Sequence, residues 1–505
     1  MSYYITTPIY YVNGEPHLGH VYTTVAVDVL ARHMRQRGED VFFLTGTDEH
    51  GEPVARAAEV QGVTPRELAD KNAERFKEVA RRVNATNDFF IRTSDPEHAA
   101  VVTDIVNRLK DNGYVYKDLY EGWYCPRCAD FKTENEVLDG NRCPIHLIEL
   151  DREHEENWFF KLSAFQDRLE QLYVDKPAFV GPTVRYNEAL AFIKSGLRDF
   201  SLSRSRISWG VPVPWDPEQV VYVWVDALLN YYSALSYARD GEDLTDRFWP
   251  ATVHVIAKDI LKFHAVFWPA LLMGADLATP DRVFIHGYLL MDEHKMSKSL
   301  GNVLDPFEVM DTYGTDALRF YLLREVSFGQ DGSISPGGFE SRYTSELANE
   351  YGNLASRTLA MIAKYRDGVV PDGAASPELD ELFGNLSADV AVALDQVEVS
   401  AALELIWTRV RGLNRYVQDQ APWQLAKDPD QAEALDQILY GLAEGLRVVT
   451  VMLLPWMPDT AERLLVALGS DDRSLECARL GAHGGGTTVG EVGQLFPRIE
   501  APVEK

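Results

Sequence analysis

The sequence predicts an α/β fold in which a parallel sheet is split by a metal-binding insert and followed by a C-terminal α-helical bundle. Residues 1–115 alternate apolar strand-like runs with amphipathic helical patterns, and this alternation returns at 220–300. Residues 116–219 break the rhythm with two pairs of metal-ligand residues. Beyond residue 336 no strand pattern is evident, and helical periodicity covers 339–366, 376–396, 398–420, 431–454 and 458–468.

The bulk composition is that of a globular protein, and it limits the possible partners. The chain has 505 residues and a formal net charge of −28, which argues against non-specific binding of nucleic acid. No signal peptide is evident, and the longest apolar stretch, 448–456, is too short to span a bilayer. We therefore expect a cytoplasmic protein that makes no membrane contact.

The first predicted strand leads directly into a helix. Residues 3–7 are apolar, and a helical pattern from Leu18 ends at Gly38, so the intervening stretch is a strand-to-helix turn. His17, Gly19 and His20 open the helix, where unpaired N–H groups and the positive dipole end suit a phosphate. On its own, HxGH is equally consistent with two solvated histidines at a helix cap.

The next elements repeat the α/β pattern. Residues 40–45 form a buried strand that ends in the polar loop 46–51, and the carboxyl end of a strand is where open α/β sheets bind ligands. Thr64 to Glu67 have the sequence of a capping box with proline at the first helical position. Residues 88–93 form a third strand, followed by a helix that ends at Gly113.

The insert carries the spacing of a zinc site. Cys125 and Cys128 form one C-x2-C pair, and Cys143 and His146 form a C-x2-H pair. Four protein ligands leave no open position, which predicts one structural Zn²⁺ per chain. The alternative is three buried thiols and an unrelated histidine. Cys477 is remote in sequence and is expected to take no part.

The second half of the sheet region ends in a basic loop. We expect a buried strand at 220–225, a helix from Asp226, a strand at 252–256, a helix at 260–273 and a strand at 282–290. Lys295 to Ser299 then read KMSKS, and two lysines three residues apart on a small-residue loop make a cationic clamp. This loop alone is consistent with an ordinary solvated basic segment.

HLGH near the N-terminus and KMSKS far downstream, in one chain, resemble the class I aminoacyl-tRNA synthetases, and the resemblance covers nearly the whole chain. The insert leaves no room for the large hydrolytic domain of the isoleucine, valine and leucine enzymes. The loop around Pro8 and the segments 224–228 and 258–264 are similar to methionyl-tRNA synthetases of the zinc-knuckle bacterial type.

The resemblance implies a domain order. The implied parts are a Rossmann-type catalytic domain in two halves, 1–115 and 220–300, a connective insert with the zinc knuckle, 116–219, a linker or stem-contact region, 301–338, a helical anticodon-binding domain, 339–470, and a tail, 471–505.

The resemblance also implies site residues, each carried over by its matching position. The implied catalytic residues are His17, His20, Lys295 and Lys298. The implied ATP-binding residues are His17, Gly19, His20, Asp259, His286, Lys295, Ser297 and Lys298. The implied methionine-binding residues are Ile9, Tyr11, Asp48, Trp224, Tyr231, Phe263 and His264. Ala257 departs from the glycine expected there, which bears on the backbone approach to ATP.

The implied activity is ligation of L-methionine to tRNA. ATP, with Mg²⁺, forms methionyl-adenylate, and the acyl group passes to the 3′-terminal ribose of tRNA(Met), both initiator and elongator. Asn349, Asn353, Arg357 and Trp423 match anticodon-binding positions, although a solvated helix face and a core tryptophan are the alternative. A monomer is expected, because no appended dimerising domain is evident.

Two other functions remain open from the sequence. A small nucleotidylyltransferase shares HxGH but needs neither the zinc insert nor the helical domain. A catalytically inactive, RNA-binding paralogue of a synthetase would be expected to have lost residues of HxGH or KMSKS, and both motifs are intact here.

Overall fold

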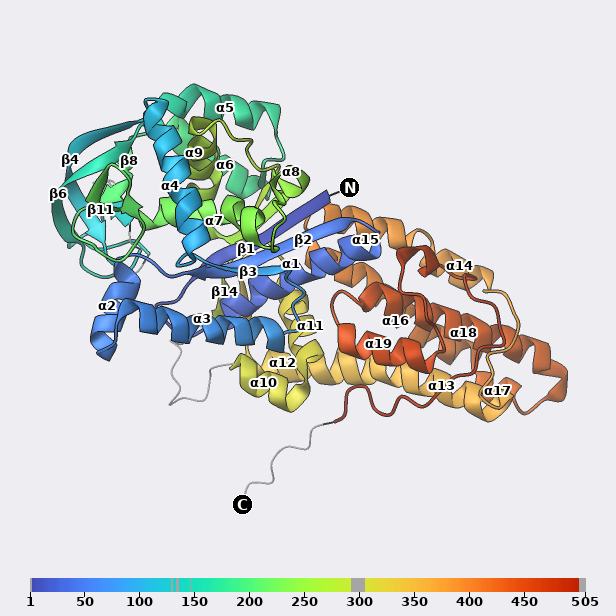
Figure 1. The fold of residues 1–505 in the computed structure, drawn as a ribbon. Coiled ribbons are helices and arrows are strands. Elements are labelled where there is room, and N and C mark those ends of the chain that lie inside the picture. The colour runs from blue at the N-terminus through green and yellow to red at the C-terminus, as the bar shows by residue number, and fades with distance from the viewer. Residues whose placement is uncertain (1, 129, 133–135, 146, 292–304, 499–505) are drawn as a thin grey trace, which may run out of the picture. The chain divides into compact units, whose positions relative to one another are not determined.

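Six strands form the central sheet, in the order β3-β2-β1-β12-β13-β7 (Figure 1). They are β1 (Ser2–Tyr11), β2 (Asp40–Asp48), β3 (Phe89–Arg92), β7 (Val180–Gly181), β12 (Val253–Ala257) and β13 (Val283–His286). Pairing is parallel between β2 and β3, β1 and β12, β12 and β13, and β13 and β7. This computed structural model describes residues 2–128, 130–132, 136–145, 147–291 and 305–498. The predicted α/β class with a parallel sheet is confirmed.

The chain divides into two compact units. The first comprises Met1–Pro16, Val41–Arg81 and Ala85–His286, and the second comprises His17–Asp40, Arg82–Asn84 and Gly287–Lys505. The described helices include none that is long and apolar enough to cross a bilayer. The six-part domain order implied by the sequence remains a prediction.

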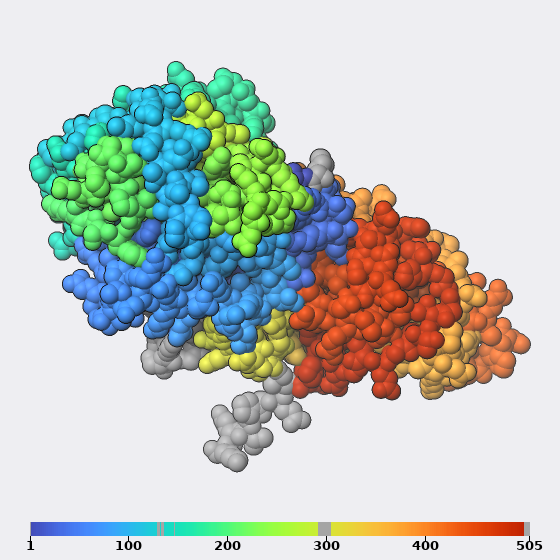
Figure 2. Space-filling view, in the orientation of Figure 1, coloured from blue at the N-terminus to red at the C-terminus, as the bar shows by residue number. Residues whose placement is uncertain are grey.

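In the first unit the sheet is buried on both faces, as parallel sheets are. The larger core joins the strands to α4 (Pro96–Asp111), α7 (Val223–Tyr237) and α9 (Trp268–Gly274). A smaller core joins Tyr10 of β1, and Val12 just after this strand, to α2 (Glu52–Gln61) and α3 (Pro65–Arg82). In Figure 2, α4 is the light-blue band that crosses the face of this unit.

The predicted capping box at the start of α3 is confirmed. The backbone N–H of Thr64 donates to Glu67 Oε2 at 2.9 Å, and the N–H of Glu67 donates to Thr64 Oγ1 at 3.2 Å. Two of the unpaired N–H groups at this helix start are thereby satisfied by side chains.

The insert is an antiparallel layer. A four-stranded sheet has the order β5-β4-β6-β8, built from β4 (Val115–Cys125), β5 (Asp130–Lys132), β6 (Asp151–Phe160) and β8 (Phe200–Ser201). A three-stranded sheet has the order β10-β11-β9, built from β9 (Ser203–Arg204), β10 (Pro212–Val213) and β11 (Asp216–Val221). Its helices are α5 (Gln166–Asp175) and α6 (Thr183–Lys194), and α8 (Thr245–Phe248) follows α7.

Two element predictions are wrong. The strand expected at 220–225 ends at Val221, pairs antiparallel with β9, and α7 begins at Val223. The strand expected at 282–290 is two strands, β13 and β14 (Leu289–Met291), of different sheets. The helix expected at 260–273 is confirmed in extent, although it begins with a 3-10 turn (Lys258–Ile260) and contains a π-helical stretch (Phe263–Phe267) before α9. A short apolar run has the same periodicity whether it is a buried strand or a buried helix turn, which explains the first error.

The second unit is mainly helical. It contains α1 (Leu18–Gln36), α10 (Pro306–Tyr313), α11 (Thr315–Glu325), α12 (Pro336–Arg342), a π-helical stretch (Tyr343–Gly352), α13 (Asn353–Arg366), α14 (Pro377–Phe383), α15 (Leu386–Asp395), α16 (Val399–Gln420), α17 (Pro422–Leu425), α18 (Ala432–Leu453) and α19 (Pro458–Ala467). β14 pairs with β15 (Gly332–Ile334). The predicted bundle is confirmed, and its packed C-terminal helices form the red surface in Figure 2.

A buried ion pair fixes α1 within this unit. Arg319 of α11 and Asp28 of α1 are both 0% exposed, and their charged groups lie 2.7 Å apart. Arg319 also donates to the carbonyls of Val83, Pro455 and Trp456. Because the remaining guanidinium donors are satisfied, the buried charge is compensated.

Candidate functional site

The carboxyl ends of β1 and β2 place three of the predicted methionine-binding residues together. Ile9 and Tyr11 lie near the end of β1, and Asp48 is the last residue of β2. The backbone N–H of Val12 donates to the carbonyl of Asp48 at 3.2 Å, which holds the two strand ends side by side. This is the edge of an open α/β sheet where ligands bind.

Asp48 is a buried carboxyl group placed to receive a cation. The residue is 1% exposed, and its Oδ1 has no hydrogen-bond partner among the residues that the structure describes. Burial raises the pKa of Asp48 well above its ordinary value, and the charge of Asp226 raises it further. The N–H of His50 and the hydroxyl of Tyr11 act in the opposite direction. A bound cation would compensate this carboxylate.

Aromatic rings line the space beside these strand ends. The rings of Trp224 and Phe263 stack with centroids 3.8 Å apart and an interplanar angle of 8°. Tyr11 meets Trp224 edge-to-face at 5.7 Å. Trp224 stands in the first turn of α7, and Phe263 opens the π-helical stretch, a feature often found at functional sites. The structure therefore brings three of the predicted aromatic residues into one cluster.

Tyr231 and His264 form a neutral hydrogen-bonded pair. Nδ1 of His264 lies 3.1 Å from the carbonyl of Ile260, so this nitrogen is the donor. Nε2 therefore accepts from the hydroxyl of Tyr231, at 2.8 Å. Burial lowers the pKa of His264 to about 4, so the ring is uncharged at neutral pH. A buried, uncharged lining suits an apolar side chain.

Three of the four predicted metal ligands come together. The Sγ atoms of Cys125, Cys128 and Cys143 lie within 4.8 Å of one another, and those of Cys128 and Cys143 are 3.6 Å apart. Zn–S bonds of about 2.3 Å in a tetrahedron put sulfurs roughly 3.8 Å apart, so the cluster fits this metal. None of the three forms a disulfide. His146 lies outside the described residues.

His17 and His20 form the cap of α1, in the second unit. Nδ1 of His17 accepts from the N–H of Gly19 at 3.1 Å, and Nδ1 of His20 accepts from the N–H of His17 at 3.1 Å. The rings stack 3.8 Å apart. Desolvation lowers the pKa of both rings, and the charge of His17 lowers that of His20 further. Each neutral ring accepts at Nδ1, so its proton is on Nε2, ready to donate to an oxygen.

Gly19 cannot be replaced without moving its neighbour. A Cβ at this position would lie 3.0 Å from Cε1 and 3.1 Å from Nδ1 of His17. The small residue therefore permits the ring of His17 to fold over the helix start.

The remaining predicted ATP residues fall in different parts of the chain. Asp259 lies in the 3-10 turn after β12, and His286 is the buried last residue of β13, both in the first unit. Ala257 has φ −83° and ψ 158°, an ordinary extended conformation, so its Cβ causes no backbone strain. Lys295, Ser297 and Lys298 lie outside the described residues.

The predicted anticodon-binding residues lie in the second unit. The guanidinium of Arg357 stands over the ring of Trp423 at 5.6 Å, a cation–π arrangement. Asn353 and Arg357 are one helical turn apart on α13, whereas Asn349 lies in the preceding π-helical stretch. Arg498, whose Nη2 donates to Asn349 Oδ1 at 3.4 Å, could not be found from any sequence pattern.

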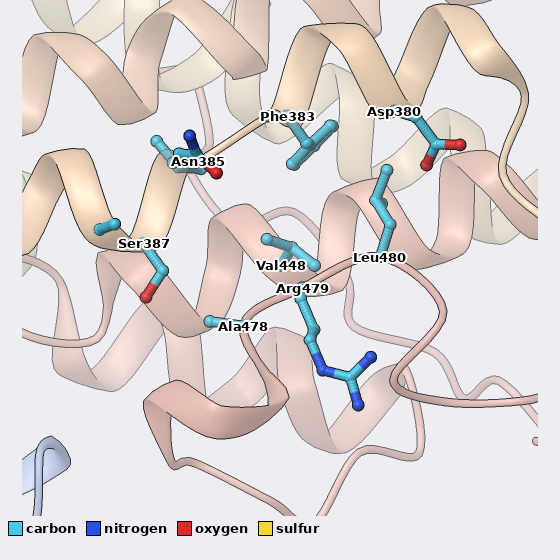
Figure 3. A pocket seen from close by; sticks show the side chains of 11 residues that line it. Asp380, Phe383, Asn385, Ser387, Val448, Ala478, Arg479 and Leu480 are labelled. Carbon is cyan, nitrogen blue, oxygen red and sulfur yellow. The ribbon is translucent and has the colours of Figure 1, made fainter.

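The helical unit also contains a pocket of about 350 Å³ between α14, α15, α18 and the segment 478–480 (Figure 3). Phe383, Val448 and Leu480 supply its apolar lining. It shares no lining residue with the predicted anticodon set.

Two family models match the chain. One, described as tRNA synthetases class I (M), matches residues 3–154 and 141–359. The other, described as the anticodon binding domain of methionyl tRNA ligase, matches residues 370–500.

Relatives match over almost the full length. A methionine–tRNA ligase of Caldanaerobacter subterraneus subsp. tengcongensis is 44% identical over 509 residues, covering 100% of this chain and 80% of the relative. One of Streptomyces coelicolor is 44% identical over 99% of this chain and 97% of the relative. The solved structure of Mycobacterium tuberculosis methionyl-tRNA synthetase in complex with methionyl-adenylate is 40% identical, with a TM-score of 0.94 over 98% of this chain and 100% of that one.

Proposed function

The chain belongs to the class I tRNA synthetases of the methionine type, and on this premise we propose that it activates L-methionine with ATP and transfers it to tRNA(Met), initiator and elongator. One observation carries the proposal: the buried Asp48 carboxyl group and an uncharged aromatic cluster lie at the same edge of the sheet. An amino acid with a cationic end and an apolar side chain is complementary to both.

The proposed methionine site divides the substrate into two parts. Asp48, with the carbonyl of Ile9 beside it, takes the ammonium group. The thioether lies against Tyr11, Trp224 and Phe263, because a polarizable sulfur gains from contact with aromatic rings. The remaining residues, Tyr231 and His264, close the pocket with a hydrogen bond that is satisfied internally, so the site offers the sulfur no unpaired charge.

Adenylate formation needs no side-chain nucleophile. A carboxylate oxygen of methionine attacks the α-phosphorus of ATP, the bond from phosphorus to the bridging oxygen breaks, and pyrophosphate leaves. The Nε2–H groups of His17 and His20 donate to phosphoryl oxygens as charge develops, and Lys295 and Lys298 neutralise the leaving pyrophosphate. Asp259, His286, Gly19 and Ser297 position the nucleotide. Mg²⁺ bound with ATP supplies further neutralisation of phosphate charge.

In the second step a ribose hydroxyl of the tRNA end attacks the acyl carbon, and AMP leaves. For tRNA choice we propose Asn349, Asn353, Arg357 and Trp423. Trp423 lies in the part of the chain that matches the methionine anticodon domain, and the other three lie just before it, at the end of the class I synthetase match. Exposed amides can pair with base edges, and an Arg-supported indole offers a stacking surface to a splayed base.

For the metal site we propose one structural Zn²⁺ held by Cys125, Cys128, Cys143 and His146. The close thiols support a thiolate-binding metal, and four protein ligands would leave no open position on the metal, which suits a structural role.

One assay separates this function from its alternatives. Methionine-dependent exchange of pyrophosphate into ATP is expected, followed by charging of tRNA(Met). An inactive RNA-binding paralogue would give no exchange. A nucleotidylyltransferase would give exchange that does not depend on methionine, and either outcome would refute the proposal.

A further inference from the structure

Asp226 is a fully buried carboxylate that none of the methionine contacts explains. It stands in the first turn of α7 and is 0% exposed. Its Oδ2 lies 2.7 Å from Nδ1 of His50, and its Oδ1 lies 2.9 Å from Nε2 of His98. Hydrogen bonds from two ring nitrogens stabilise a carboxylate in its charged form, as does the start of a helix.

The two histidines are themselves held in place. Nδ1 of His98 lies 2.7 Å from Oγ of Ser233, and the ring of His50 packs edge-on against Trp209 at 5.2 Å. Burial would raise the pKa of Asp226, but the charges and hydrogen bonds of His50 and His98 outweigh burial and lower this pKa to about 2. Asp226 is therefore negative at neutral and mildly acidic pH.

The negative charge of Asp226 raises the pKa of Asp48. The charges of Asp226 and Glu49 both raise the pKa of Asp48, while the backbone N–H of His50 and the hydroxyl of Tyr11 lower it. His50, two residues after Asp48, holds Asp226 through its ring at 2.7 Å. Glu49 is compensated by Arg92, whose Nε and Nη2 lie 2.7 Å and 2.9 Å from its carboxylate oxygens. Asp226 has the imidazoles of His50 and His98 as partners instead of an arginine.

We propose that Asp226 is a positioning residue for methionine uptake: the His50–Asp226–His98 network holds a second buried negative charge that acts on the ammonium-binding carboxylate and sets the pH range in which methionine binds. The inference rests on the proposed function, because it takes Asp48 to be the ammonium site.

The physical reason is competition between a proton and the ammonium group. Two buried carboxylates favour the uptake of one positive charge, which can be either a proton on Asp48 or the substrate ammonium. As the pH falls, protonation of Asp48 removes the charge that the ammonium group needs. The acid limit of methionine binding therefore follows the protonation of Asp48, and Asp226 moves that limit upward.

The test is the pH profile of methionine affinity. We would measure the Kd of L-methionine for the full chain by calorimetry between about pH 4.5 and 8.5, for the wild type and Asp226→Asn. Removing the charge of Asp226 should move the acid midpoint down by about 1 pH unit, while circular dichroism confirms that the fold is kept. In pyrophosphate exchange, the KM for methionine should follow the same shift, and kcat at saturating methionine should change less.

Asp95→Asn is the matched control, since Asp95 is a partly buried carboxylate of the same unit that accepts from Tyr237 and does not face Asp48. Its midpoint should equal that of the wild type. His50→Gln puts a neutral amide in place of the imidazole whose charge and hydrogen bond lower the pKa of Asp226, so its midpoint should move up. This variant also decides the matter if Asp226→Asn does not fold.

The outcomes separate the two claims. A wild type that binds no methionine at any pH would refute the proposed function. A wild type that binds methionine without an acid limit, or with an acid limit that Asp226→Asn leaves unchanged, would refute only the role of Asp226. A downward or absent shift in His50→Gln would also refute that role.

Discussion

The indole Nε1 of Trp224 donates a 3.2 Å hydrogen bond to the backbone carbonyl of Cys128. The same indole stacks on Phe263, so a ring of the aromatic cluster is tied directly to the thiol cluster. The insert therefore holds one side chain of the proposed methionine site in place.

Trp224→Phe should weaken methionine binding selectively. Phenylalanine retains an aromatic face for Phe263 but cannot donate to Cys128, and losing a net hydrogen bond costs about 0.5–1.5 kcal/mol. We expect the KM for methionine to rise by roughly 2- to 13-fold with kcat nearly unchanged. The measurement is pyrophosphate exchange at varied methionine. Equal losses in kcat and kcat/KM would point to a role in the transition state instead.

Metal analysis should give about one zinc per chain, lost in Cys143→Ser and retained in Cys477→Ser. Cys477 is a matched control because it is also buried, but it lies in the other unit, where its thiol donates to the carbonyl of Ser474 at 3.0 Å. A metal-free wild type, or loss of zinc in Cys477→Ser, would overturn the assignment.

His264 should make the fold sensitive to acid. The folded pKa of His264 is about 4, below the ordinary value of 6.5, so between these pH values the unfolded chain binds more protons than the folded chain. Stability from this group is complete above about pH 6.5 and falls by about 3 kcal/mol as the pH drops to 4. Urea unfolding at several pH values should give a shallower decline for His264→Gln, and parallel curves would contradict the prediction.

Lys298→Ala should lower the rate of adenylate formation by roughly 10²–10³, which is the scale of losing one charge-stabilising donor. Methionine affinity should change little, because the lysine meets phosphate in the proposed mechanism. Pre-steady-state kinetics would measure the rate of adenylate formation. A wild-type rate in Lys298→Ala would contradict a catalytic role for the loop.

Features that depend on residues close together in the chain could be predicted from the sequence. The structure confirms the capping box at Thr64, the helical segments of the bundle and the clustering of the three cysteines Cys125, Cys128 and Cys143. The errors fell where local patterns are ambiguous, as at 220–225, where an apolar run changes from strand to helix at Tyr222.

Contacts between distant segments could not be predicted in the same way. Periodicity does not reveal that Asp226 bonds to both His50 and His98, or that Arg498 reaches Asn349, because each contact depends on the tertiary fold. The π-helical stretch at Phe263 was also missed, since its sequence does not differ in pattern from an α-helix.

The bundle offers a test of tRNA binding with an internal control. If Trp423 stacks on an anticodon base, Trp423→Ala should cost about 1–3 kcal/mol, a loss of roughly 5- to 150-fold in aminoacylation efficiency. Methionine-dependent exchange should stay near wild type, because that half-reaction needs no tRNA. Trp423 is only half-buried beside Arg357, so truncation should disturb packing little.

Trp407 is the control, because it is 0% exposed in the same bundle and donates to Glu350 at 2.7 Å. Truncating a buried tryptophan costs about 3–5 kcal/mol of stability, so Trp407→Ala should lower the thermal midpoint and depress both assays together. A Trp423→Ala variant that behaves like Trp407→Ala would make Trp423 a packing residue. A Trp423→Ala variant that charges tRNA normally would show that other residues bind the anticodon. Arg498 and Asn349 would then be the first pair to test.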